Sequence, residues 1–445
     1  MARRLMLIFL VLFCAVTAAA ETSIPATPAG RALAAWLEAF NSGDRARIDL
    51  FLKTYSPSPA QDALTSAQFR GQSGGVNLIA ITRSEKYLIG FRVQEKSQPA
   101  ILFGRIEVTA SKTPAIQNFI LRPVPREAVL DEVKLDAAER KQTIEFIITD
   151  LNASYVFPAV AQKMADSLRA HESKGDYNTV TDGDAFASLL TTHLLEVSHD
   201  KHLGVYYQPY KFNAQPAPVT YDQFTEDRKA MARDCGFRKL DVLANNVGYM
   251  KVDFFADPLG CGRTAAAAMT FLANTDAVIF DLRDNGGGDP RMVALMCSYL
   301  FDKPVHLNDF YDRVANSTTQ YWTPRYVPGS RLGPKPAYVL TSAHTFSGAE
   351  EFAYDLKNLR RVTVVGETTG GGAHVVSSLK AGEHFIIYVP HGRSISPVTR
   401  TDWEGTGVAP DVPVSPENAL PTAERLAAER IQQGALRDAI SSTVK

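Results

Sequence analysis

Cysteine is scarce in this chain of 445 residues, with only four in all. Cys14 lies in the apolar N-terminal stretch, which leaves Cys235, Cys261 and Cys297 for the rest of the protein. Three cysteines without metal-ligand spacing exclude a disulfide framework and a cysteine-rich zinc site. Cys297 lies in an apolar helical run, so we expect it in the core. Cys235 and Cys261 flank a predicted strand, and the sequence is equally compatible with a disulfide between them and with two free thiols.

The chain also lacks an excess of charge of one sign, because its formal net charge is −1. Binding to nucleic acid or to an anionic membrane surface is therefore not expected. After the N-terminus, no run reaches the roughly 18 apolar residues of a typical membrane helix, so we predict no membrane span in the mature chain. The hydrophobic content of 45% is that of a globular protein. The length predicts two or three domains.

The first twenty residues have the three parts of a secretory signal peptide. Arg3 and Arg4 supply the positive charge, residues 5–16 form an apolar segment, and Ala18 to Ala20 offer a small-residue cleavage site. We therefore expect cleavage after Ala20 and a periplasmic or extracellular mature protein.

Residues 29–124 predict an α+β domain. Apolar positions at helical spacing run to about residue 53 and are interrupted at Asn41-Ser42-Gly43-Asp44; four strand-like runs follow. The LEAFNSGD stretch before a set of strands resembles the NTF2-like (SnoaL-like) cone fold. This resemblance implies a small-molecule-binding or structural role, and no catalytic set is visible in the domain.

Residues 128–205 predict a small helical bundle that ends in a polar loop. The loop carries His199, Asp200 and His202 just before a strand. A histidine in such a loop is usually a surface residue. The H-x-x-H spacing lacks a third ligand at a recognisable distance in the sequence. We therefore predict no metal and no cofactor here.

Residues 235–430 alternate strands with helices, which predicts an α/β core with a mostly parallel sheet. One buried strand, 277–283, runs into the turn Asp284-Asn285-Gly286-Gly287-Gly288. This turn lacks the G-x-G-x-x-G spacing of a dinucleotide site. Its glycines either let the backbone approach a ligand closely or form a plain tight turn, and the local sequence leaves both open.

Ser347 lies at the junction of a predicted strand, 337–340, and a predicted helix, 349–356. A serine at a strand-to-helix turn is exposed beside free backbone N–H groups, which suits a nucleophile and its oxyanion site. Ser347 and Glu350 also match the S-x-x-E capping box, which any helix start can use. The two roles are compatible.

Four segments occur in an order that resembles peptidase family S41, the tail-specific or C-terminal processing proteases. They are DLRDNGGG at 281–288, TFSGAE at 345–350, VGETTGG at 365–371 and EGTGVAPD at 404–411. With the SHDKHL loop at 198–203, the chain looks most like the branch similar to interphotoreceptor retinoid-binding protein. The resemblance covers about residues 130–425 and implies a ClpP/crotonase-like core.

Two features depart from the processing proteases. Their serine–lysine dyad takes its lysine from the loop after G-E-x-T, where this chain has Gly372 and no lysine before Lys380. The interval between His202 and the strand at Val247 is also too short for their PDZ domain, so none is expected. The resemblance to the tricorn-like branch instead implies a Ser-His-Glu site.

On that resemblance, Ser347 would be the nucleophile, His202 its base and Glu404 the third member. The oxyanion hole would be formed by the backbone N–H groups of Gly348, Gly287 and Gly288. Two residues of the glycine loop, His374 and Gly371, would contact substrate. Other histidines could replace His202, namely His199, His344 or His374. The implied partner is a peptide or protein substrate, and a homo-oligomer is possible.

A second function is open, because retinoid-binding relatives use this fold to carry apolar ligands. On that alternative the chain would be a weak or inactive S41-fold binding protein for retinoid-like or lipid-like molecules. The presence of both Ser347 and His202 favours an enzyme.

Overall fold

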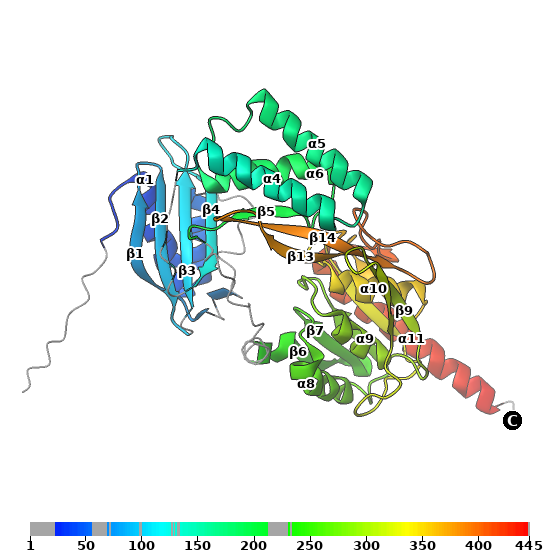
Figure 1. Cartoon of the computed structure of the whole chain (residues 1–445). Helices are drawn as coiled ribbons and strands as arrows, with labels where there is room; N and C mark the ends of the chain where they lie inside the picture. The colour runs from blue at the N-terminus through cyan, green and yellow to red at the C-terminus, as the bar shows by residue number, and fades with distance from the viewer. Residues whose placement is uncertain are drawn as a thin grey trace, which may run out of the picture. The chain divides into compact units, whose positions relative to one another are not determined.

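The computed structural model describes residues 23–55, 69–70, 73–97, 100–125, 128, 130, 134–211, 230–231 and 234–443. The chain divides into two compact units, Met1–Leu130 and Asp131–Lys445 (Figure 1). The predicted signal peptide, residues 1–20, lies outside the described residues. Among the helices that are described, none is both long and apolar enough to cross a bilayer.

The first unit packs two helices on a four-stranded antiparallel sheet. Its elements are α1 (Pro28–Ser42), α2 (Arg45–Tyr55), β1 (Val76–Ser84), β2 (Leu88–Glu95), β3 (Ile101–Val108) and β4 (Ile116–Val124), with the strands in sequence order. The break between the helices falls at Gly43, whose φ of 65° ends α1. Trp36 is fully buried against Phe40, Phe91 and Phe119. The predicted α+β order is confirmed, and the resemblance to the NTF2-like cone stays a prediction.

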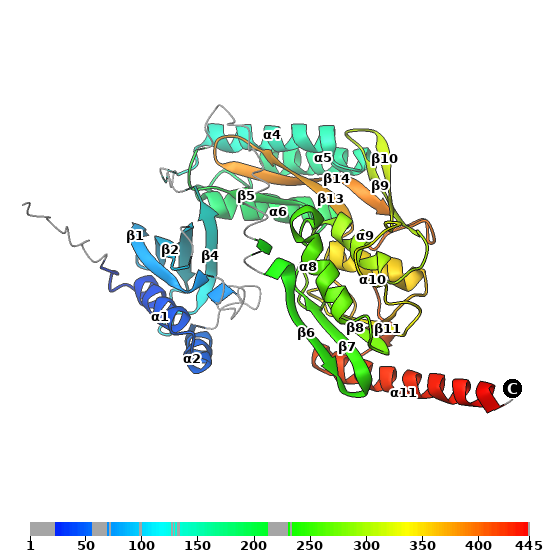
Figure 2. The ribbon, with the colours of Figure 1, turned by 90° about the horizontal axis from the view of Figure 1, so that it is seen from below.

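The second unit begins with three helices that cover one face of an antiparallel sheet. The helices are α4 (Ala137–Ser154), α5 (Pro158–Lys174) and α6 (Gly183–Ser198). The strands form a five-stranded sheet from β5 (Gly204–Tyr207), β9 (His306–Asp312), β10 (Ser317–Trp322), β13 (His374–Lys380) and β14 (Phe385–Ile395). Because β5 pairs with β14, the predicted helical part and the predicted core share one sheet (Figure 2).

A six-stranded sheet forms the centre of the second unit. Its order is β15 (Val412–Pro413), β12 (Thr363–Gly366), β11 (Ala337–Thr341), β8 (Ala277–Asp281), β7 (Val247–Val252) and β6 (Phe237–Leu243). All neighbours are parallel except β6 and β7. This confirms the predicted mostly parallel sheet.

Helices cover both faces of this sheet. One apolar cluster packs side chains of α8 (Pro258–Phe271), α9 (Pro290–Ser298) and α10 (Gly348–Asn358) on one face. A second cluster packs the start of the long helix α11 (Pro416–Thr443) on the other. Strands buried on both faces explain why β8 and β11 are apolar at nearly every position.

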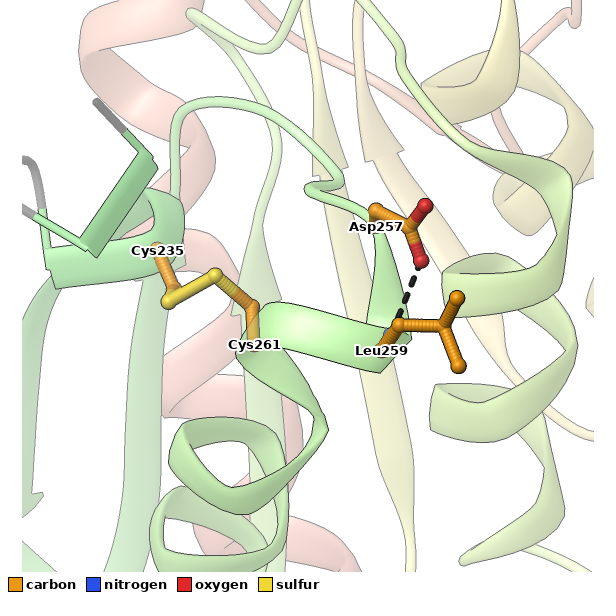
Figure 3. Close-up of a disulfide and its surroundings, with 4 residues drawn as sticks. All are labelled: Cys235, Asp257, Leu259 and Cys261. Carbon is orange, nitrogen blue, oxygen red and sulfur yellow. Dashed lines mark hydrogen bonds between the residues drawn. A yellow bond between two sulfur atoms is a disulfide. The ribbon is translucent and has the colours of Figure 1, made fainter. Parts of the chain in front are cut away.

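A disulfide joins Cys235, just before β6, to Cys261 in the first turns of α8 (Figure 3). The two Cα atoms are 5.6 Å apart, within the usual range for a disulfide. Asp257 caps the same helix by accepting a hydrogen bond from the Leu259 N–H at 2.8 Å (Figure 3). The structure thus selects the paired alternative for these two cysteines. Cys297 is a free thiol and is buried, as predicted.

Candidate active site

The candidate site lies at the carboxyl ends of the parallel strands β8, β11 and β12. The chain leaves these strands through the glycine turn (284–288), the serine turn (342–347) and the glycine loop (367–373). In open parallel sheets, the carboxyl ends of neighbouring strands meet at one edge, and ligands bind there. Three of the segments singled out in the sequence are therefore brought together.

Ser347 has a strained backbone at the start of α10. Its φ of 53° and ψ of −122° lie in a region that favours glycine. The Ser347 N–H donates to Oε2 of Glu350 at 2.8 Å, and the preceding Phe346 N–H donates to the Asn285 carbonyl at 3.0 Å. The turn is thus held from both sides, and this is the strand-to-helix geometry of a nucleophile elbow.

The glycine turn lies directly against Ser347. A Cβ added to Gly287 would lie 2.7 Å from Ser347 Cβ, and one added to Gly348 would lie 3.1 Å from the Gly288 nitrogen. Only glycine permits this approach. These glycines therefore let the turn approach the serine turn closely, and approach to a ligand stays a prediction.

The N–H groups of this turn differ in their availability. The Gly287 N–H donates to Oδ1 of Asn285 at 2.8 Å, so it is used within the protein. The N–H groups of Gly288 and Gly348 have no acceptor among the described residues. These two N–H groups form a pair of free donors beside Ser347, as an oxyanion hole requires.

His202 lies in the loop that follows α6. His199 ends the helix with a φ of 55°, and the His202 N–H then donates to Oδ1 of the buried Asp200 at 3.1 Å. The His202 ring packs on Phe346, with ring centroids 4.7 Å apart, next to Ser347 in the sequence. No hydrogen bond between His202 and Ser347 is present among the described residues. Burial lowers the pKa of His202 to about 4, so the ring is neutral at pH 7.

Glu404 lies near the Nδ1 atom of the His202 ring. Its Oε2 accepts a hydrogen bond from the Ala373 N–H at 2.6 Å and lies 4.0 Å from Nδ1 of His202. Two buried atoms here have no hydrogen-bond partner in the described part of the chain, namely Nδ1 of His202 and Oε1 of Glu404. Burial raises the pKa of Glu404 to about 7, and the positive charge of His374 counteracts this rise.

His374 is buried and bonded, in contrast to the substrate contact suggested for it. Its side chain is 3% exposed, and Nδ1 lies 2.6 Å from Oδ2 of Asp200 and 3.6 Å from Oε2 of Glu404. Burial lowers the pKa of His374, but the hydrogen bond and the charge of Asp200 outweigh it and leave a raised pKa. The hydroxyl of Tyr155 donates to the same carboxylate at 3.1 Å. This arrangement suits a positioning role for His374.

Glu350 holds the glycine loop against the serine turn. Its fully buried carboxylate accepts four hydrogen bonds, from the Thr369 hydroxyl and from the N–H groups of Ser347, Gly371 and Gly372. The Gly371 N–H suggested for substrate binding is therefore used within the protein. The capping-box pattern signalled the bond to Ser347, and nothing in the sequence signalled the other three.

Gly372 occupies the position where the resemblance places a lysine in the processing proteases. A Cβ added there would lie 2.3 Å from Cζ of Phe346 and 2.5 Å from Cε1 of His202. A lysine at position 372 would have to displace the His202 ring. The His202 side chain therefore occupies the space that the lysine base would need. The nearby Lys201 donates to the Gly370 carbonyl at 2.5 Å and ties the base loop to the glycine loop.

The remaining histidine alternatives lie at the surface. His199 is exposed at the end of α6, and His344 is exposed in the serine turn. Asp200, Tyr155 and Lys201 were not assigned a role from the sequence. The only signal for Asp200 was its place between the two histidines, and Tyr155 lies 45 residues away.

Comparison with known proteins identifies two adjoining regions. A family model described as peptidase family S41 matches residues 246–414. A second, described as the N-terminal domain of Peptidase_S41 in eukaryotic IRBP, matches residues 135–233. A stretch of 176 residues is 26% identical to carboxyl-terminal-processing peptidase 2, chloroplastic, of Arabidopsis thaliana. It covers 38% of this chain and 32% of that relative, so the match spans about a third of the relative's length.

Solved structures show a likeness over about two thirds of the chain. A putative peptidase from Parabacteroides merdae ATCC 43184 is 19% identical with a TM-score of 0.46, covering 65% of this chain and 96% of that one. The photosystem II D1 C-terminal processing protease is 16% identical with a TM-score of 0.40, covering 63% and 94%. At these scores the likeness supports no inference about activity. The two family models carry the assignment: over residues 135–233 and 246–414, this chain belongs to peptidase family S41.

Proposed function

We propose that this protein is an exported serine endopeptidase that hydrolyses peptide bonds with Ser347, His202 and Glu404. The observation that carries the proposal is the strained serine turn with two free N–H groups beside it. A backbone of that shape is costly and persists where the surrounding structure holds it, which is typical of functional sites.

In the proposed reaction, the Ser347 hydroxyl attacks the carbonyl carbon of the substrate while His202 accepts the hydroxyl proton. The negative charge that forms on the carbonyl oxygen is stabilised by the N–H groups of Gly288 and Gly348. His202 then gives its proton to the leaving amine as the C–N bond breaks. Water hydrolyses the resulting ester by the same steps, which frees Ser347.

The environment of His202 fits this base. A pKa of about 4 keeps the imidazole neutral at pH 7, so the ring is in the form that accepts a proton. Glu404, with His374 and Asp200 behind it, would stabilise the imidazolium that forms during the reaction. Closing the 4.0 Å gap between His202 and Glu404 requires only a small side-chain shift.

Export is proposed from the N-terminal signal-peptide pattern and is supported by the disulfide. Disulfides persist in oxidising compartments such as the bacterial periplasm and the cell exterior. The Cys235–Cys261 bond therefore agrees with a periplasmic or extracellular location. N-terminal sequencing of the protein recovered from that compartment should begin at Glu21.

Labelling with a fluorophosphonate tests the nucleophile. The wild-type protein should be labelled at Ser347, and Ser347→Ala should lose both the label and peptide hydrolysis, by at least about a thousandfold. Ser342→Ala is the matched control, because Ser342 lies in the same turn. The Ser342→Ala protein should still be labelled at Ser347. A protein without labelling that takes up retinol or fatty acid tightly would instead be the apolar-ligand carrier.

A further inference from the structure

We infer that Asp200, His202 and Glu404 form a binding site for a divalent transition metal such as Zn²⁺, and that the metal inhibits the enzyme reversibly. The binding part of this inference is independent of the activity. Only the inhibition rests on the proposed function.

The three side chains converge although they are far apart in the sequence. One ligand atom from each lies within 4.8 Å of the others. His199, the other histidine of the loop, is exposed and not part of this cluster, and the other two ligands are the carboxylates of Asp200 and Glu404. A cluster of one imidazole and two carboxylates is a donor set that zinc accepts.

Two atoms of these side chains lack a hydrogen-bond partner among the described residues. Nδ1 of His202 and Oε1 of Glu404 are buried and accept or donate no hydrogen bond among the described residues. Buried polar atoms are normally bonded, so an unpaired nitrogen and an unpaired carboxylate oxygen in one place call for a ligand. The side chains of His202 and Glu404 are 11% and 15% exposed, so both are in contact with solvent.

The distances fit a metal after a small contraction. Zinc lies about 2.0–2.2 Å from nitrogen and oxygen ligands, which places tetrahedral ligands roughly 3.4 Å apart. Nδ1 of His202 lies 4.0 Å from Oε2 of Glu404, the oxygen that also accepts the Ala373 N–H. One ligand atom of each of the three side chains lies within 4.8 Å of the others, so each must move by about an ångström or less. A water would complete the coordination.

Further contacts orient the deepest ligand. Asp200 is fully buried, and its Oδ2 accepts hydrogen bonds from Tyr155 and from His374. Among the described residues, its Oδ1 accepts only the His202 N–H, which leaves a lone pair for a metal. Such outer contacts fix ligand orientation and raise metal affinity.

The metal would inhibit through the tautomer of His202. A neutral imidazole has one ring nitrogen that carries a proton and one that accepts. With a metal bound to Nδ1, the proton of the neutral ring must lie on Nε2. That nitrogen then cannot accept the proton of Ser347, and the reaction stops at its first step.

Binding is tested on the Ser347→Ala protein, which cannot digest itself. Adding Co²⁺ should produce the visible absorption of a tetrahedral site, and Zn²⁺ should remove it by competition. His202→Gln and Glu404→Gln should each abolish the spectrum, and Tyr155→Phe should weaken binding about tenfold. His306→Gln is the matched control, because His306 has a carboxylate partner, Asp309, at 2.7 Å outside the site.

Circular dichroism of each variant separates lost ligands from lost folding. A spectrum that is absent in the folded Ser347→Ala protein, or that survives both His202→Gln and Glu404→Gln, overturns the metal site. Loss of the spectrum in His306→Gln alone would show binding elsewhere and overturn it equally.

Measurements of peptide hydrolysis distinguish the proposed peptidase function from the proposed metal site. In an active wild-type protein, Zn²⁺ should stop hydrolysis at the concentrations that fill the site, and a chelator should restore it. If no peptide is hydrolysed but the cobalt spectrum depends on His202, the proposed function fails and the metal site stands. Full hydrolysis with the site filled would refute the inhibition.

Discussion

Helix α10 presents two neighbouring carboxylates with opposite environments. Glu350 faces the glycine loop and accepts four hydrogen bonds. Glu351, the next residue, is 3% exposed, and its Oε1 has no partner among the described residues. Asp355, one helical turn on, is 1% exposed, and neither of its oxygens has a partner there. Burial alone therefore says little about whether a carboxylate holds the fold together.

The pKa values of the carboxyl groups differ between the Glu350 side and the Glu351 side of α10. Burial raises the pKa of Glu350, and the hydrogen bonds from Thr369, Gly372, Gly371 and Ser347 oppose that rise. Burial raises the pKa of Glu351 to about 8, and the charge of Asp289 adds to the rise. Burial and the neighbouring Glu351 raise the pKa of Asp355 as well. One side of α10 carries a carboxylate that accepts four hydrogen bonds, and the other carries two carboxyl groups whose pKa values burial raises.

Replacing Glu350 by glutamine should have the largest effect of the helix variants on stability. The amide would point N–H groups at N–H donors of the glycine loop, so buried donors lose their acceptor. We expect Glu350→Gln to lower the free energy of unfolding by about 3 kcal/mol. Displacement of the glycine loop should also lower peptide hydrolysis by about a hundredfold. Urea unfolding and turnover of a peptide substrate measure the two effects, and an unchanged unfolding midpoint would contradict the role given to Glu350.

Replacing Glu351 by glutamine should stabilise the protein, whereas the same change at Glu350 should destabilise it. Glu351 has a folded-state pKa of about 8, above the ordinary 4.5, so its protonated form is favoured by folding. Its contribution to stability is present below about pH 4.5 and is lost as the pH rises to 8. Glu351→Gln removes this loss and should raise the free energy of unfolding at pH 8. At pH 4 the variant and the wild type should be equal.

Urea unfolding of Glu351→Gln at several pH values checks this expectation. A variant that is less stable than the wild type at pH 8 would show that Glu351 is ionised and paired in the folded protein. Glu367→Gln, a change in a less buried carboxyl of the glycine loop, serves as the control.

The smallest effect concerns the backbone of Ser347. Its φ of 53° suits glycine better than any residue with a Cβ. Ser347→Gly should therefore be more stable than Ser347→Ala by about 1 kcal/mol, although neither variant has the nucleophile. Thermal unfolding of the two variants measures the difference, and equal midpoints would show that the turn relaxes when the hydroxyl is removed.

Local patterns in the sequence predicted most of the elements around the site. The apolar run before Ser347 and the helix after it were placed within two residues of β11 and α10, because burial on both faces leaves a continuous apolar signal. The hairpin of β9 and β10 was not predicted. Its outer strand is exposed at most positions and carries threonine and serine, so it lacks the alternation that marks a half-buried strand.

The role of each site residue was harder to predict than its presence. His374, in the glycine loop, was predicted to contact substrate, and the structure bonds it to Asp200, which lies 174 residues earlier. Gly287 and Gly288 looked equivalent in the sequence, but only Gly288 keeps its N–H free among the described residues, because the Asn285 side chain takes the other. Such choices depend on hydrogen bonds between distant segments, which no local pattern encodes.

The sequence by itself determined the order of elements, the serine at a strand-to-helix turn and the glycines that let the backbone approach it. These features follow from periodicity and from the conformations each residue allows, which are local properties. The tertiary structure decided which histidine packs on Phe346 beside Ser347 and that Cys235 pairs with Cys261. It also decided that Glu350 accepts four hydrogen bonds while Oε1 of Glu351 has no partner among the described residues. The reason is physical: a buried polar group acquires its charge state and its role from the partners that folding brings to it.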